Sequence, residues 1–226
     1  MEKEINSHDF LPKRFQFLNI AEGDSGITIA GDDFSIPSEM YPILGTPEIF
    51  LYENTEKILD TQVMKIIDGI SGGIGKCYSN AEAVVEALHQ HGFEAIQYVG
   101  WMIYAHTLPV HHSWAIVTGD SQKQPCIIDL TGDYDSLNDY MKYYKDEVPD
   151  ARERIKNYYQ LASHHLNSER MQLGKASKYT LYIGTPCSKD KGIEIYQELL
   201  KKYPNHPAHI ETDENGLTKL QREVLK

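Results

Sequence analysis

The stretch GKCYSNAEAVVEALHQHG, residues 75–92, begins like a phosphate-binding loop and continues as an amphipathic helix. A Walker-type loop would need glycine at Ile70 and a serine or threonine at Cys77, and this chain has neither. The dinucleotide-binding pattern would need glycine at Tyr78. Both phosphate-binding interpretations therefore fail, and the cysteine that precedes the helix needs another explanation.

The helix prediction rests on the spacing of apolar residues after the cysteine. Ala81, Val84 and Leu88 recur with Cys77 at intervals that place them on one face of a helix. Gly92 is suited to end such a helix, because glycine readily adopts the left-handed conformation found there. Cys77 is therefore expected at or next to the positive end of a helix.

Three strand-like runs follow, at residues 94–104, 111–119 and 125–132, and short turn-forming segments between them indicate an antiparallel meander. Alternate residues of a strand share a face, so His112 points one way and its neighbour His111 the other. If the second and third strands pair with His112 beside Asp129, a carboxylate can orient the imidazole. A different register would present His111 instead.

The rest of the chain completes a mixed composition of helices and strands, and the whole of residues 1–226 is predicted to form one α+β domain. We expect a catalytic core over about 53–132, an irregular N-terminal extension over 1–50, and a mainly helical C-terminal elaboration over 136–226. The individual elements predicted outside the meander are a strand at 26–30, a helix at 53–70, helices at 137–148 and 152–166, a strand at 178–186, a helix at 189–203 and a short helix from Leu217.

A cysteine, a histidine and an aspartate in this order have a chemical use. The thiolate is the nucleophilic form of cysteine, and both a helix N-terminus and a nearby imidazolium stabilise it. A carboxylate such as Asp129 holds the imidazole of His112 in one tautomer and supports its protonated form. Cys77 would then attack a carbonyl carbon, and backbone N–H groups of the first helical turn could bind the resulting oxyanion.

The motifs CYSNA, LPVHHSW and IIDLT, which contain Cys77, His112 and Asp129, resemble the transglutaminase-like branch of the papain-like cysteine enzymes. They are also similar to small bacterial and phage-type members. The resemblance covers about residues 72–132. It implies a catalytic helix packed on an antiparallel sheet, and acyl-transfer chemistry on an amide, ester or thioester.

Several neighbouring residues have two interpretations each. Asn80 is a candidate oxyanion donor, but Ser79 and Glu82 form a capping-box pattern that would start the helix at Asn80 and leave Cys77 just outside it. Trp114 is expected in the core or as a lid over the imidazole. The candidate cleft-lining residues are Trp114, Tyr98 and Trp101, although aromatic residues in strands are mostly core. Asp129 could alternatively serve only to open a turn.

Composition excludes several classes of function. The net charge of −11 argues against nucleic acid or an anionic membrane as the main partner, and no run approaches the length of a membrane helix. Cys126 and Cys187 are expected to be core or incidental residues, and three scattered cysteines favour a reducing cytoplasm. The histidine clusters lack the spacing of a metal site, so neither a metal nor a cofactor is predicted.

The sequence therefore predicts a cytoplasmic cysteine hydrolase or acyltransferase that uses Cys77, His112 and Asp129. Its substrate would be a peptide, a protein side chain or a small molecule that carries an amide or acyl group. The alternative is a catalytically inactive papain-like fold that serves as a binding module.

Overall fold

The computed structural model describes residues 11–16, 18–23, 26–30, 35–36, 47–70, 76–104, 110–118, 124–130, 172–176 and 180–202. Its elements in chain order are η2 (Lys13–Phe15), β1 (Asn19–Gly23), β2 (Gly26–Ala30), β3 (Ser35–Ile36), β4 (Glu48–Phe50), α1 (Thr61–Asp68), α2 (Cys77–Gln90), β5 (Ala95–Tyr104), β6 (Val110–Val117), β7 (Cys126–Asp129), β8 (Gln172–Gly174), β9 (Thr180–Pro186) and α5 (Lys189–Lys202). The helices predicted over 137–148, 152–166 and from Leu217 lie outside the described residues. The fold class is α+β, as predicted.

A six-stranded antiparallel sheet organises the molecule, with the strand order β4-β9-β5-β6-β7-β8. The predicted meander is confirmed as β5, β6 and β7 at the centre of this sheet. β9 arrives from far along the sequence and pairs with β5, which places it between β5 and β4. Residues of the late chain are thereby brought next to the predicted catalytic segment.

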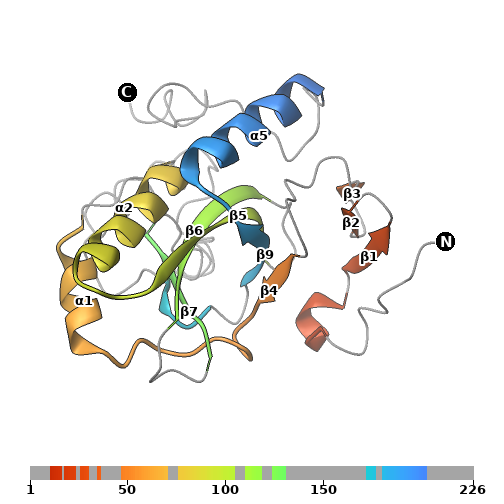
Figure 1. Ribbon diagram of the computed structural model, residues 1–226. Helices are drawn as coiled ribbons and strands as arrows, with labels where there is room; N and C mark the ends of the chain where they lie inside the picture. Colours follow the sequence, from red (N-terminus) through yellow and green to blue (C-terminus); the bar gives the residue numbers. More distant parts are fainter. Residues whose placement is uncertain are drawn as a thin grey trace, which may run out of the picture.

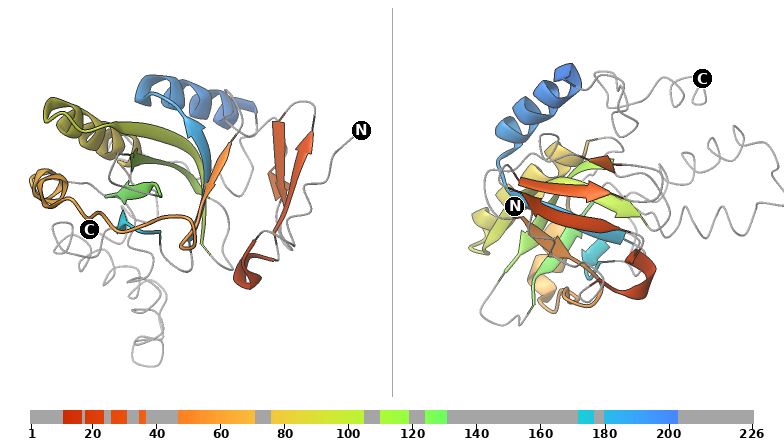
Figure 2. Two further views of the ribbon diagram at one scale, coloured as in Figure 1. Left: turned by 60° about the horizontal axis from the view of Figure 1, so that its bottom comes forward. Right: turned by 90° about the vertical axis from the view of Figure 1, so that its right-hand side faces the viewer.

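Helices and a small second sheet cover different parts of the main sheet. Figure 1 shows α1 and α2 at one end, α5 beside the beginning of α2, and β1–β3 at the opposite end near β4; Figure 2 shows the same arrangement from two other directions. The apolar stripe of α2 packs with Ala115, Val117 and Ile128 of the main sheet. The residues around β1–β3 share a core with Trp101 and Ile183 instead.

Two predictions for the first 70 residues are wrong in part. The N-terminal segment contributes the strand predicted at 26–30, but also β1, β3 and β4, so it is not irregular throughout. The helix predicted over 53–70 forms only over α1. Asp60 starts it by accepting hydrogen bonds from the N–H groups of Gln62 and Val63, whereas the side chains of Asn54 and Thr55 bond to nearby backbone and hold a turn.

Candidate active site

Cys77 is the first residue of α2, and Lys76 precedes the helix as its N-cap. The first backbone bond of the helix runs from the N–H of Asn80 to the carbonyl of Lys76, at 2.8 Å. The capping box is therefore wrong, because Ser79 lies inside the helix and not before it. Helix geometry leaves the N–H groups of the first turn, from Cys77 to Ser79, without an acceptor one turn earlier, and these groups carry the positive end of the helix dipole.

The other end of α2 agrees with the prediction for Gly92. This glycine has a φ of 82°, and its N–H bonds to the carbonyl of His89 at 3.0 Å while that of Phe93 bonds to Leu88 at 3.0 Å. Such bonds satisfy the last carbonyls of a helix and turn the chain toward β5.

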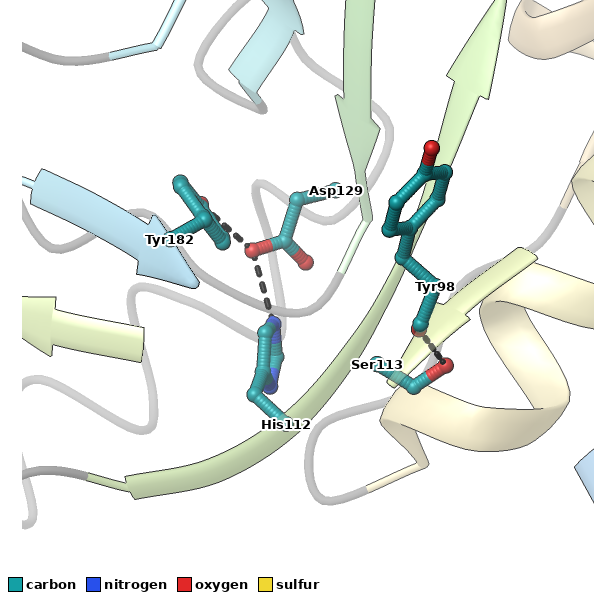
Figure 3. Close-up of polar contacts among 5 residues, drawn as sticks. All are labelled: Tyr98, His112, Ser113, Asp129 and Tyr182. Carbon is teal, nitrogen blue, oxygen red and sulfur yellow. Dashed lines mark hydrogen bonds and ion pairs between the residues drawn. The ribbon is translucent and has the colours of Figure 1, made fainter. Parts of the chain in front are cut away.

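His112 and Asp129 lie on the same face of the main sheet, as the predicted register requires. Ala115 pairs with Ile128, so Asp129 is level with Trp114 and one diagonal step from His112. The Nε2 of His112 lies 2.8 Å from Oδ2 of Asp129, and both side chains are buried (Figure 3). Asp129 thus contacts the imidazole and does not merely open a turn.

The charge state of His112 is set by opposing effects. Burial lowers its pKa, because a charged imidazolium loses its hydration. The charge of Asp129 and the hydrogen bond to it act in the other direction, and a hydrogen bond and charge at Cys77 add to them. Together they raise the pKa of His112 to about 10, so the imidazolium is the form at neutral pH.

Cys77 reaches His112 from the start of α2. Cys77 is among the groups that raise the pKa of His112, which places the two side chains close to each other. His112 lies on the part of β6 that precedes its pairs with β7, which begin at Ala115. Cys77 itself is partly exposed to solvent. The structure therefore brings the three predicted residues together and leaves the thiol accessible.

Tyr182 completes the polar cluster, and sequence reasoning missed it. Its hydroxyl donates to Oδ2 of Asp129 at 2.8 Å, the same oxygen that contacts His112 (Figure 3). Tyr182 lies on β9, more than fifty residues after Asp129 in the sequence. No local pattern around Tyr182 marks this role, because it depends on the pairing of β9 with β5.

A second group of polar contacts fixes the first turn of α2 on the sheet. The side chain of Gln97 donates to the carbonyl of Tyr78 at 3.2 Å and to the hydroxyl of Ser113 at 2.9 Å. Ser113 donates in turn to the carbonyl of Tyr98 at 2.8 Å (Figure 3). These bonds tie the residue after Cys77 to the residue after His112.

α5 also packs against the beginning of α2. Lys189 and Glu82 form an ion pair at 2.7 Å, and a side chain at Gly192 would collide with Tyr78. Gly192 therefore permits the close approach of the two helices. This contact places one described element of the region after Ser136 beside the helical turn that contains Cys77.

His111 points to the opposite face, into an aromatic cluster. Its Nδ1 lies 2.7 Å from the hydroxyl of Tyr78, and its ring stacks on Tyr196 at 4.6 Å and meets Trp101 edge-on at 5.1 Å. The hydrogen bond of His112 to Asp129 makes His112, not His111, the imidazole of the predicted cluster.

The remaining predicted site residues are buried. Asn80 lies in the first turn of α2 with a buried side chain. Trp101 and Trp114 are 0 % exposed, and Tyr98 is buried with its hydroxyl 2.8 Å from Glu48. The cleft-lining interpretation is thus not supported, since these rings belong to the core. Trp114 stacks toward His112 with ring centroids 6.3 Å apart, and its full burial agrees with the interpretation as a core residue.

The other two cysteines differ in exposure. Cys126 is fully buried among apolar side chains, which confirms it as a core residue. Cys187 is partly exposed just before α5, and burial raises its pKa while the nearby Lys191 opposes that shift. Cys187 lies outside the helix that follows it, whereas Cys77 is the first residue of α2.

Within the residues that the structure describes, no group of three or more His, Cys, Asp and Glu side chains is arranged to hold a metal ion. No described helix combines the length and apolar character needed to cross a membrane. Comparison of the chain with protein-family models, with curated proteins and with solved structures found no match.

Proposed function

We propose that this protein is a cysteine-dependent hydrolase or acyltransferase that acts on an amide, ester or thioester through Cys77, His112 and Asp129. The observation that carries the proposal is the 2.8 Å contact of His112 with the buried carboxylate of Asp129, together with a partly exposed Cys77 near enough to raise the pKa of His112. A transglutaminase-like, papain-like fold is part of the same proposal, and its support is the motif order and the helix-on-sheet arrangement.

The proposal uses the surroundings of the sulfur at the start of α2. An imidazolium at His112 and the positive end of the helix dipole both attract negative charge on the sulfur of Cys77. Asp129 in turn stabilises the imidazolium and fixes which of its nitrogens faces the sulfur. The arrangement is the one that activates a cysteine nucleophile.

In the reaction, the thiolate sulfur of Cys77 forms a bond to the acyl carbon, and the carbonyl oxygen becomes an oxyanion that N–H groups of the first helical turn can bind. The bond from carbon to the leaving group then breaks as the leaving group takes a proton from His112. A thioester to Cys77 remains. Water or an amine attacks that thioester, gives a proton back to His112, and releases the thiolate.

A reporter ester tests this proposal without knowledge of the natural substrate. With p-nitrophenyl acetate, we expect rapid release of about one p-nitrophenol per protein molecule, followed by slower turnover. Mass spectrometry of the quenched reaction should find the acetyl group on Cys77. The Cys187→Ala variant is the matched control and should behave as the wild type, whereas Cys77→Ala should lose the burst. Acetylation confined to lysines would favour the binding module instead.

A further inference from the structure

One oxygen of Asp129 has two hydrogen-bond partners, and the proposed reaction gives a role to only one of them, His112. Nε2 of His112 and the hydroxyl of Tyr182 both lie 2.8 Å from Oδ2 of Asp129. All three side chains are buried, and that of Tyr182 is 0 % exposed. A carboxylate that is cut off from water keeps its charge only where donors or an opposite charge replace its hydration.

We propose that Tyr182 is a positioning residue for the reaction, which keeps Asp129 ionised and turned toward His112. The inference rests on the proposed function of Cys77 and its partners. A hydroxyl that donates to the charged form of a carboxylate stabilises that form. Tyr182 also fixes the rotation of the carboxylate, because it binds the oxygen that faces the imidazole.

Strand pairing and ring packing hold Tyr182 in the position from which its hydroxyl reaches Asp129. Tyr182 lies in the middle of β9, paired with Met102 of β5 on one side and with Phe50 of β4 on the other. Its ring packs against that of Trp114 with centroids 5.0 Å apart. Two strands and an aromatic neighbour thus hold the ring in place.

Two titratable groups that contact Asp129 are His112 on β6 and Tyr182 on β9, and β5 lies between these two strands in the sheet. Cys77 on α2 is among the groups that raise the pKa of His112. Loss of the Tyr182 hydroxyl therefore leaves the imidazolium as partner but removes one donor to the charged carboxylate. Protonation of Asp129 then begins at a higher pH, and His112 loses its counter-charge earlier as the pH falls.

The test compares Tyr182→Phe with Tyr98→Phe, and both are measured by the rate of iodoacetamide alkylation of Cys77 from pH 4 to pH 9. Each variant loses one tyrosine hydroxyl that donates to a carboxylate at 2.8 Å, the buried Asp129 for Tyr182 and the exposed Glu48 for Tyr98. In Tyr182→Phe, we expect the pH at which the alkylation rate falls on the acid side to rise by ~1 pH unit. Above pH 8 the rate should stay within about threefold of the wild type. Tyr98→Phe should leave the profile unchanged.

The outcomes separate the inference from the proposed function. The inference is wrong, and Tyr182 only fills the core, in either of two cases. Either Tyr182→Phe lowers the alkylation rate of Cys77 by the same factor at every pH, or its pH profile is identical to that of the wild type. If Cys77 in the wild-type protein shows no preferential alkylation at all, the proposed function itself fails.

A second measurement needs no variant, should Tyr182→Phe not fold. Two donors on one oxygen bring their protons close together, so nuclear magnetic resonance of the wild-type protein should show a cross-relaxation signal between the Tyr182 hydroxyl proton and the proton on Nε2 of His112. Observation of both protons without that signal would overturn the inference.

Discussion

His111 and His112 are neighbours in β6, yet the two faces of the sheet give them different partners. His112 bonds to the carboxylate of Asp129, whereas His111 bonds to the hydroxyl of Tyr78 and stacks on Tyr196. Burial raises the pKa of Tyr78, which keeps its hydroxyl neutral. A buried imidazole beside a carboxylate can hold a positive charge and serve as acid and base, and one among aromatic rings packs as part of the core.

The largest expected effect separates the two histidines directly. His112→Gln should lower turnover of p-nitrophenyl acetate by roughly 10²–10⁴-fold, because it removes the group that takes and returns the proton. His111→Gln should change turnover per folded molecule by less than about tenfold, since His111 bonds to Tyr78 and packs against aromatic rings on the other face of the sheet. Equal losses in the two variants, after correction for the folded fraction, would remove the distinction between the two faces.

A smaller effect is expected in the pH dependence of stability. The pKa of His112 in the folded protein, about 10, lies above the value of 6.5 for an unperturbed histidine. Its contribution to the free energy of unfolding is therefore complete below pH 6.5 and is lost as the pH rises toward 10. One proton changes that free energy by at most ~1.4 kcal/mol per pH unit.

Urea unfolding of the wild type, His112→Gln and His111→Gln at pH 6, 8 and 10 measures this contribution. The difference in unfolding free energy between the wild type and His112→Gln should shrink as the pH rises. The corresponding difference for His111→Gln serves as the control for general effects of pH. A difference for His112→Gln that stays constant from pH 6 to pH 10 would mean that His112 is not an imidazolium in the folded protein.

Most of the fold around the site follows from patterns in short stretches of sequence. Apolar residues at helical spacing predict α2, and alternation with turn residues between the runs predicts β5, β6 and β7. The shared face of His112 and Asp129 follows from the same alternation, once the two strands pair.

What sequence reasoning missed depends on contacts between distant segments. Tyr182 joins Asp129 because β9 pairs with β5, and no local pattern reports that pairing. The short strands β4 and β8 were missed for the same reason. The start of α2 was ambiguous because Ser79 and Glu82 fit a capping box, but Glu82 is paired with Lys189 of α5.

The central claim is that the surroundings of Cys77 activate its thiol, and competition among the cysteines tests it most directly. The folded protein is treated near pH 7 with a limiting amount of iodoacetamide, and adducts are mapped by mass spectrometry. Cys187 is the internal control, since it is also partly exposed but burial raises its pKa. We expect alkylation of Cys77 to be at least roughly tenfold faster than that of Cys187, and to slow in His112→Gln but not in His111→Gln. The account would be contradicted if Cys187 were alkylated as fast as Cys77 or faster. It would also be contradicted if the rate at Cys77 were the same in His112→Gln as in the wild type.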